Sequence, residues 1–239
     1  YIQTGGNVFI IGTSESQNLN LKGDFDMSGG TLTRGGTAGP TSIATVIFSG
    51  TTEQAFIKSG GTISNAVNFT VNNNAIVNFD TYVLSGSTGT FTLSSGGKII
   101  TANSNGLDPA TGAIQITSSL NSNADYEFRG TNTGNFTTTP SNGVRDLIIN
   151  NTDVAGEVSL DRALTVNRNL VLTAGLLTTT TNLLTLGTAA TASAPSVTSF
   201  VNGPLAKTGN TAFTFPVGKA GEGFRTIGIT APSGIATFR

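Results

Sequence analysis

The sequence predicts an all-β protein whose main part is a parallel β-helix, a solenoid of stacked strands. Thr, Gly, Asn and Ser make up close to half of the 239 residues, and clusters of them interrupt every window long enough to form a helix. Short apolar runs recur roughly every 8 to 12 residues, as expected of strands joined by tight turns. Internal repeats favour the solenoid over an array of β-sandwiches, which is the alternative fold for this pattern.

A series of short apolar runs predicts the strands of the main part of the chain. Each run is bounded by Gly, Asn or Ser, the residues that commonly end strands. Most of the 14 Phe residues fall on alternating positions, which indicates that they face the core. In chain order the runs are Val8 to Ile11, Phe25 to Met27, Val46 to Phe48, Phe69 to Val71, Ile76 to Phe79, Phe91 to Leu93, Ile114 to Ile116, Leu147 to Ile149, Leu164 to Val166, Leu170 to Leu172 and Leu183 to Leu186.

A Gly-centred hexapeptide repeats along the chain. Its copies are Ser28 to Thr33 (SGGTLT), Ser59 to Ser64 (SGGTIS), Ser95 to Ile100 (SGGKII) and, in weaker form, Thr173 to Thr178 (TAGLLT). A longer echo aligns Phe48 to Thr51 (FSGT) with Phe128 to Thr131 (FRGT). Gly and Asn accept the left-handed backbone that corners require, and stacked polar side chains can hydrogen-bond between coils. The repeats therefore predict seven or eight coils of about 25 residues, in a column roughly 35 Å tall.

We expect the solenoid coils to occupy residues 1–190 and a transition or capping β segment to occupy residues 191–239. A stretch of small uncharged residues that ends at Pro195 predicts a connector between the two. Beyond it, Pro204 and Pro216 interrupt the strand pattern. Repeat architectures need capping units, so this segment is expected either to pack as a partial cap on the last coil or to be held by a partner.

The second part of the chain carries a resemblance in three segments, Ser199 to Gly209 (SFVNGPLAKTG), Phe213 to Lys219 (FTFPVGK) and Phe224 to Ile227 (FRTI). These segments resemble a recurring element of very large secreted and cell-surface proteins of Bacteroidota bacteria. The close resemblance covers residues 195–239, with Phe224 where Tyr is expected. It implies the closing coil of a Thr/Asn/Gly-rich β-solenoid that leads into further β domains, in adhesins and in gliding or biofilm proteins commonly exported by the type IX secretion system.

The ends of the sequence predict a piece of a longer protein. Tyr1 stands where an initiator Met would be, and the first residues lack the basic and apolar zones of a signal peptide. The final residues alternate like a strand that has barely begun, so we expect the natural chain to continue beyond Arg239. No apolar run approaches the roughly 18 residues of a membrane span, so no membrane insertion is expected.

Composition excludes several functional classes. Only 10% of residues are charged, with 12 Lys and Arg against 13 Asp and Glu, so the clustered positive charge of a nucleic-acid binder is missing. His and Cys are both absent, which excludes imidazole or thiolate zinc sites, Cys nucleophiles, His-ligated haem and His-containing catalytic triads. We expect no enzyme, no cofactor, and no catalytic, cofactor-binding or metal-binding residue.

Two carboxylate pairs are the only candidates for acid–base chemistry. Asp24 and Asp26 are two residues apart on one predicted strand, with carboxyl groups about 7 Å apart on one face, a separation used in glycoside hydrolysis. Asp125 and Glu127 repeat the spacing. The basic residues are scattered singly along the sequence, and solvated carboxylates on an outward strand face are the ordinary means of keeping such a protein soluble.

Other binding sites receive little support from the sequence. The aspartates available for calcium match neither an EF-hand nor a calcium-binding nonapeptide repeat; they are Asp24, Asp26, Asp80, Asp108, Asp153 and Asp161. The Asn-x-Ser/Thr sites at Asn68, Asn135 and Asn150 are fewer than chance predicts. The segment Gly218 to Gly223 lacks phosphate-loop spacing and is interpreted as a mobile hairpin.

Flat Thr arrays, which bind ice on some Thr-rich solenoids, need the same Thr-x-Thr pair in successive coils. Thr31-Leu32-Thr33 and Thr90-Phe91-Thr92 fit this pattern. The other predicted coils do not keep the pair in register, so an ice-binding surface is not expected. Aromatic platforms for sugars are scarce as well, since the chain has no Trp and only Tyr1, Tyr82 and Tyr126.

These observations favour a non-catalytic structural or adhesive stalk segment of a large bacterial surface protein, at an extracellular or cell-surface location. Expected partners are other domains of the same polypeptide, with secretion-machine components and surface polysaccharide as further candidates. The alternative is an extracellular carbohydrate-active module that binds or cleaves polysaccharide. Convergence of charged and aromatic residues in one groove would favour that alternative.

Overall fold

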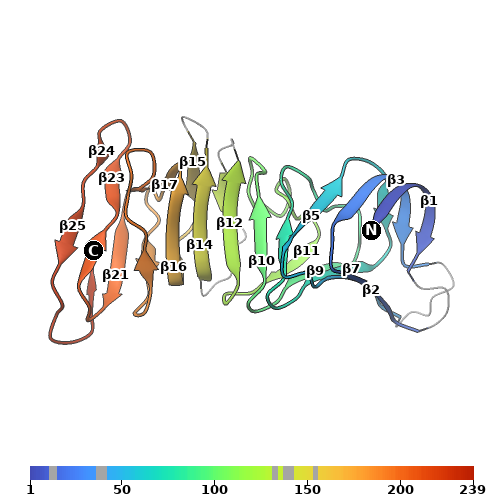
Figure 1. Ribbon diagram of the computed structural model, residues 1–239, viewed down its shortest axis with the longest axis horizontal. Helices are drawn as coiled ribbons and strands as arrows, with labels where there is room; N and C mark the ends of the chain where they lie inside the picture. Colours follow the sequence, from blue (N-terminus) through green and yellow to red (C-terminus); the bar gives the residue numbers. More distant parts are fainter. Residues whose placement is uncertain (11–14, 36–41, 131–133, 137–142, 153–155) are drawn as a thin grey trace.

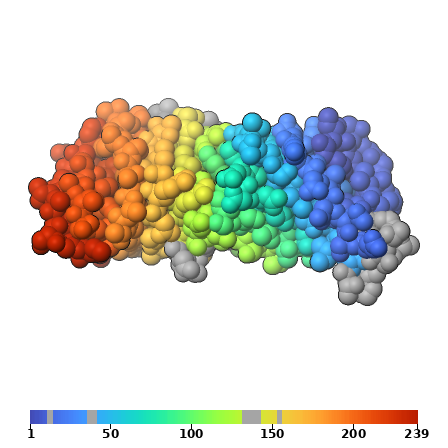
Figure 2. All heavy atoms as spheres, turned by 60° about the horizontal axis from the view of Figure 1, so that its bottom comes forward, coloured from blue at the N-terminus to red at the C-terminus, as the bar shows by residue number. Residues whose placement is uncertain are grey.

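The computed structural model describes residues 1–10, 15–35, 42–130, 134–136, 143–152 and 156–239. Over these residues the chain forms strands and turns and contains no helix. The strands stack as parallel coils around one continuous apolar core, so the predicted β-solenoid is confirmed. Figure 1 shows an elongated column with the first strands at one end and the last strands at the other, and Figure 2 shows the same progression along the molecular surface.

One sheet, here named the spine sheet, runs the whole length of the column. Its strands are β1 (Ile2–Phe9), β3 (Phe25–Thr33), β5 (Glu53–Lys58), β8 (Ile76–Asn78), β10 (Lys98–Thr101), β12 (Asp125–Gly130), β14 (Val144–Asn151), β16 (Leu164–Ala174), β18 (Leu184–Leu186), β21 (Leu205–Gly209) and β26 (Ala236–Phe238). Two short strands, β6 (Thr62–Ser64) and β19 (Thr191–Ala192), pair with β3 and β16. All pairs along the spine are parallel until β21 meets β26.

Two further sheets divide the column lengthwise. The N-terminal side sheet contains β2 (Gln17–Leu21), β4 (Ala44–Phe48), β7 (Val67–Val71), β9 (Thr90–Leu93) and β11 (Thr117–Leu120). The C-terminal side sheet contains β13 (Gly134–Phe136), β15 (Glu157–Leu160), β17 (Leu176–Thr178), β20 (Val201–Asn202), β23 (Val217–Lys219) and β24 (Gly223–Phe224). A separate pair is formed by β22 (Phe213–Phe215) and β25 (Ile227–Ile229).

The coils differ in length. The chain returns to the same place on the spine after 31 residues where Phe25 pairs with Phe56, but after 20 residues where Leu164 pairs with Leu184. The ten parallel strands that the described part of the spine contains give a column of about 43 Å at a spacing of about 4.8 Å. The parallel ladder continues past residue 190 to β21 and β23, while the domain division near that residue stays a prediction.

Left-handed glycines form the corner that the hexapeptide repeat marks. The first two copies of the repeat pair residue by residue, with Leu32 opposite Ile63. Gly6, Gly30 and Gly61 all have φ between 67° and 74°, and a Cβ added at Gly30 would lie 2.3 Å from the Gly6 carbonyl oxygen. Only glycine combines this φ with such a close approach of neighbouring coils. The longer echo has no structural counterpart, because it aligns β4 of a side sheet with β12 of the spine.

The core changes from aromatic to aliphatic along the column. In the first coils, Tyr1, Phe25, Phe56 and Phe79 stack in one column with ring centroids 4.8 to 5.1 Å apart. In later coils the inward positions carry aliphatic side chains, and Leu164, Leu184 and Leu205 stack on successive spine strands. The prediction that Phe residues build the core therefore holds chiefly for the N-terminal half.

Most predicted strands are present, with three local differences. Ile114 forms only an isolated bridge with Leu84, and the strand lies one step further on, at the polar residues of β11. The runs at 164–166 and 170–172 belong to one strand, β16, interrupted by a bulge opposite β14. Ile11 lies outside the described residues.

The chain ends in a layer that runs back over the last parallel coil. After the turn at Gly221, strands β24, β25 and β26 pair antiparallel with β23, β22 and β21. Each strand of the last coil is thus covered by one strand of reversed direction, as the capping alternative predicted. An apolar hollow of about 330 Å³ remains beside this layer, and Ile227 at its rim is 62% exposed.

Candidate functional site

The first carboxylate pair has a structural role at one of its two residues. Asp24 lies just before β3, and its Oδ1 accepts a hydrogen bond of 2.8 Å from the backbone N–H of Ala55 in the next coil. Asp26 lies in β3 between Ile2 and Ile57 of the neighbouring strands. No ion pair involves either carboxylate within the described residues. Asp24 therefore bonds one coil to the next, and no basic group is paired with the two carboxylates.

The second carboxylate pair belongs to a much larger group of charges on the outer face of the spine sheet. We name this group the ion-pair ladder. It contains four carboxylates and four cations, so its formal charge is balanced; its members are Glu53, Lys98, Asp125, Glu127, Arg129, Arg145, Asp146 and Arg168. The parallel register creates it, because Lys98, Asp125, Asp146 and Asn169 occupy the same position on four adjacent strands.

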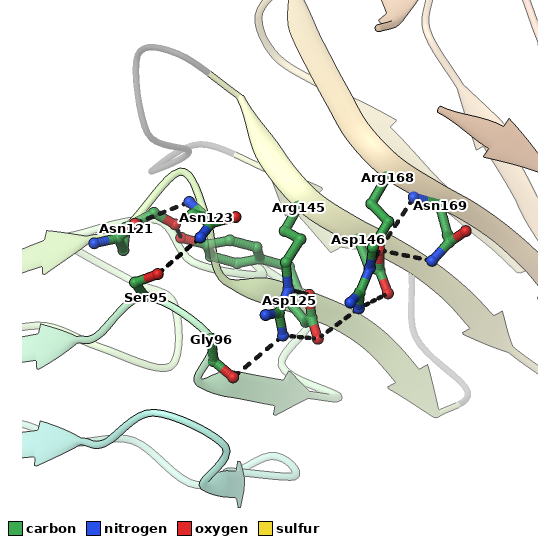
Figure 3. Close-up of polar contacts among 10 residues, drawn as sticks. Ser95, Gly96, Asn121, Asn123, Asp125, Arg145, Asp146, Arg168 and Asn169 are labelled. Atoms are coloured by element: carbon green, nitrogen blue, oxygen red, sulfur yellow. Dashed lines mark hydrogen bonds and ion pairs between the residues drawn. The ribbon is translucent and has the colours of Figure 1, made fainter. Parts of the chain in front are cut away.

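The C-terminal half of the ladder consists of two guanidinium–carboxylate forks (Figure 3). Arg145 donates from Nε and Nη2 to the two oxygens of Asp125, each at 2.7 Å, and also to the Gly96 carbonyl oxygen. Arg168 binds the two oxygens of Asp146 at 2.7 and 2.5 Å and lies 3.5 Å from Asp125. Such two-pronged pairs are among the strongest polar contacts in proteins, so they bond β12, β14 and β16 together.

The N-terminal half of the ladder is centred on Glu127, which is 5% exposed. Lys98 lies 2.6 Å from its Oε2, and Arg129 Nε donates to its Oε1 at 2.7 Å. Arg129 also reaches Glu53 on β5, three strands away, at 3.0 Å. Glu53 in turn accepts a hydrogen bond from the Asn78 side chain. The contacts link four consecutive strands of the spine.

The electrostatic environment keeps the ladder carboxylates ionised. Burial alone would raise the pKa of Glu127, but hydrogen bonds and charges from Arg129 and Lys98 outweigh burial and hold the pKa below its ordinary value. For Asp146, burial is likewise outweighed by Arg168 and Asn169, so its pKa is lowered. The pKa of Arg145 is raised, first by its hydrogen bond to Asp125. A general acid needs a raised carboxyl pKa, which is the opposite of this arrangement.

The expectation that basic residues are scattered singly is wrong for the folded chain. They are separated in sequence, but the coil spacing brings Lys98, Arg145 and Arg168 onto one face next to Asp125 and Glu127. The sequence signal was the recurrence of charged residues at intervals close to one coil. It could not be read in advance because coil lengths vary between 20 and 31 residues.

The candidate calcium residues do not come together. Asp108 closes its own turn by accepting hydrogen bonds from Ala110 and Thr111, which lower its pKa in that order of backbone and side-chain contacts. Asp161 contacts Arg162 at an exposed position, and Asp80 follows β8 with a φ of 46°. Asp153 lies outside the described residues. In the described ranges, no three acidic side chains gather closely enough to hold a metal ion.

The remaining sequence candidates have local roles. Gly218 to Gly223 spans the β23–β24 hairpin, with the Lys219 ammonium paired to Glu222. Asn68 accepts a hydrogen bond from the Thr90 backbone, and Asn150 contacts Glu127, while the side chain of Asn135 is outside the description. Tyr126 is fully buried. None of these positions forms an exposed aromatic platform.

Sequence reasoning missed the role of the Lys207 side chain, which is 2% exposed. Its ammonium donates to the carbonyl oxygens of Gly187, Thr188 and Thr208 at 2.7 to 3.0 Å and lies 5.8 Å from the centre of the Phe213 ring. These contacts bind the last parallel coil to the preceding one. The Ala-Lys-Thr-Gly portion of the recurring segment is thereby explained by packing.

A second candidate surface is the outward face of the N-terminal side sheet, here named the polar face. It consists of two rows of residues that lie side by side on five strands, β2, β4, β7, β9 and β11 (Figure 1). The first row is Asn18, Thr45, Asn68, Thr90 and Thr117, and the second is Asn20, Ile47, Thr70, Thr92 and Ser119. The four pairings that align these strands contain no register shift.

The polar face corrects the expectation about Thr arrays. Thr90-x-Thr92 lies in register with Thr117-x-Ser119 on one side and Asn68-x-Thr70 on the other. The other predicted pair, Thr31-x-Thr33, belongs to a different face, where it aligns with Thr62-x-Ser64. The array was not recognised in the sequence because Asn and Ser substitute for Thr, and because coils of unequal length hide the alignment.

Comparisons with known proteins do not identify the chain, since no protein-family model, curated protein or solved structure matches it. Within the described residues, none of the structure forms a helix of the length and apolarity that a membrane crossing requires.

Proposed function

We propose that this chain is a non-catalytic stalk segment of a large bacterial cell-surface or secreted protein. Its role is to extend, stiffen and present other domains of the same polypeptide. The observation that carries this proposal is the unbroken spine sheet, which links every coil from β1 to β21 around a single core. A continuous sheet resists bending because any bend must break the same ladder of backbone hydrogen bonds.

The outer face of the spine supports a mechanical role. Charged groups do converge there, which is one half of the arrangement expected of a carbohydrate-active module. They are paired with one another in forks and chains, as for Asp125 with Arg145 and Glu127 with Lys98, and no aromatic side chain takes part in these pairs within the described residues. This arrangement favours the stalk over the alternative of polysaccharide binding or cleavage.

The proposed cellular setting rests on the resemblance of residues 195–239 to Bacteroidota surface proteins. Secretion through the type IX system, a location outside the cell, and roles in adhesion, gliding or biofilm formation follow from that resemblance. Secretion-machine components and surface polysaccharide are the proposed external partners. Immunogold labelling of intact source cells with an antibody against this chain tests the location, and label confined to the cell interior would contradict it.

Rigidity can be tested directly because the chain has no native Cys. Spin labels on Ser59→Cys and Ala189→Cys, both at exposed positions, lie near β5 and β18, six spine strands apart. A stalk predicts one narrow distance distribution centred at roughly 30 Å along the axis. A broad or multiple distribution under native conditions would contradict the proposal, and the same pair in denaturant gives the reference for a flexible chain.

A further inference from the structure

The hydroxyl groups of the polar face are available to a ligand. Thr45, Thr70, Thr92 and Thr117 are exposed or half-exposed on the outer face of the sheet. Their hydroxyls form no hydrogen bond with another protein group in the described part of the chain. Elsewhere in the protein, Thr and Ser hydroxyls bind neighbouring coils, as Ser87 does with the Asn65 and Val67 carbonyl groups.

The polar face is also a regular two-dimensional lattice. Its strands are about 4.8 Å apart, and residues i and i+2 on each strand are about 6.7 Å apart. The register is unbroken across all five strands, whereas the spine pairings of β1 with β3 and of β14 with β16 contain shifts. Threonine is β-branched, so its χ1 is restricted and its hydroxyl and methyl groups hold fixed positions.

The polar face carries no charge at any of its ten positions. The next outward row follows the ends of the strands and contains Lys22, Ser49, Asn72, Ser94 and Asn121, with its one charge at the edge strand. This contrasts with the spine sheet, where the ion-pair ladder occupies the outer face. An uncharged lattice of donors and acceptors suits an uncharged, periodic partner.

We propose that the polar face is an ice-binding surface. Ice presents uncharged hydrogen-bond donors and acceptors in rows that repeat over distances similar to those between the side chains of this lattice. Hydroxyl and amide groups can join that network, while the Thr methyl groups and Ile47 fill the spaces between rows without holding a competing hydration shell. The pre-ordered strand backbone and stiff Thr rotamers reduce the entropy lost on binding.

A crystalline polysaccharide is the other periodic partner, and the face fits it less well. Sugar rings are commonly held by stacking on aromatic side chains, and the ten positions contain none. The lining is open and follows a single sheet, so it also lacks the convergent walls that enclose a polysaccharide chain. The inference is independent of the stalk, because a rigid rod that does not bind ice leaves the spin-label result unchanged.

The test is partition of the 239-residue chain into slowly grown ice, together with the shape of single ice crystals in its solution. We expect the chain to concentrate in the ice fraction and to facet the crystals. Thr92→Lys places a charge at the centre of the lattice and is expected to abolish both effects. Thr62→Lys makes the same change at an exposed strand position of the other face and is expected to behave as the unmodified chain.

Folding is controlled by circular dichroism, and Thr92→Val provides a milder variant that removes one hydroxyl while keeping the shape and the strand preference. It is expected to weaken partition without changing the fold. Exclusion of the unmodified chain from ice would overturn the proposal, as would full retention of ice partition by folded Thr92→Lys. Binding of the unmodified chain to crystalline cellulose or chitin but not to ice would also overturn it in favour of a polysaccharide surface.

Discussion

The N-terminal and C-terminal halves of the solenoid hold their coils together in different ways. In the N-terminal half, the stacked rings of Phe25, Phe56 and Phe79 lie inside the column, and the side sheet presents an uncharged outer face. In the C-terminal half, leucines fill the core, and forks such as Arg145 with Asp125 bind adjacent strands from outside. The same backbone ladder is thus reinforced from within at one end and from without at the other.

This difference shows what determines register in a parallel solenoid. A stack of aliphatic side chains tolerates a shift along the strand, because one leucine packs against another in several arrangements. Stacked rings restrict the shift through ring geometry, and a guanidinium–carboxylate fork restricts it through directional hydrogen bonds. The ladder therefore occurs where the aromatic column ends, and it supplies the specificity that a leucine core lacks.

The largest expected effect is on the aromatic column. Phe56 is fully buried between Phe25 and Phe79, so Phe56→Ala should lower the free energy of unfolding by about 3–5 kcal/mol. Leu170→Ala, at an equally buried position in the C-terminal half, should lower it by about 2–4 kcal/mol. Urea unfolding followed by circular dichroism measures both. A larger loss for Leu170→Ala would mean that the aromatic column is not the stronger element.

The next effect tests the ion-pair ladder. Asp125→Asn removes the charge that accepts both prongs of Arg145 and leaves that guanidinium half-paired. Loss of hydrogen bonds to a charged, largely buried group should lower the free energy of unfolding by about 1.5–3 kcal/mol. Hydrogen exchange should rise in β12 and β14 but not in β4 and β7. Uniform exchange changes along the column would argue against a local role in register.

The architecture could be predicted from the sequence because it depends on local patterns. Alternating apolar residues, the absence of helix-length runs and the Gly-centred repeat each reflect the backbone of a single coil. Thus Ser28 to Thr33 and Ser59 to Ser64, identified as repeats, pair in register. The strand at Thr117 escaped because its outward residues are polar and only Leu120 provides an apolar signal.

The candidate surfaces could not be predicted, because each one combines residues from several coils. Lys98, Asp125 and Asp146 become neighbours only once the lengths of two intervening loops are known. The rows of the polar face likewise need four strand registers at once. Coil length varies since the corners can absorb turns of different size, and nothing local fixes that length. A periodic search with a single period therefore misses both surfaces.

A smaller effect is expected from pH. The pKa values of Glu127 and Asp146 are lower in the folded chain than their ordinary values, so the unfolded chain binds more protons once the pH falls to about 4. The stability that these groups contribute is complete above that pH and is lost as the pH falls through the lowered values. Unfolding free energy measured near pH 7 and near pH 3 should show this decrease. Glu127→Gln should reduce the decrease, and an unchanged pH dependence would contradict the assignment.

The smallest effect is expected at the first carboxylate pair, which has the same spacing as Asp125 and Glu127 but lies in the N-terminal half. In the double variant Asp24→Asn, Asp26→Asn, the amide oxygen at residue 24 can still accept the Ala55 N–H, and no ion pair of the described residues is lost. The free energy of unfolding should therefore change by less than about 1 kcal/mol, as for other surface substitutions. Any activity of the parent protein should also be unchanged. A larger loss of stability would show that a charged acceptor is needed to bond the first coils. Loss of polysaccharide cleavage by the parent protein would instead assign chemistry to this pair and support the carbohydrate-active alternative.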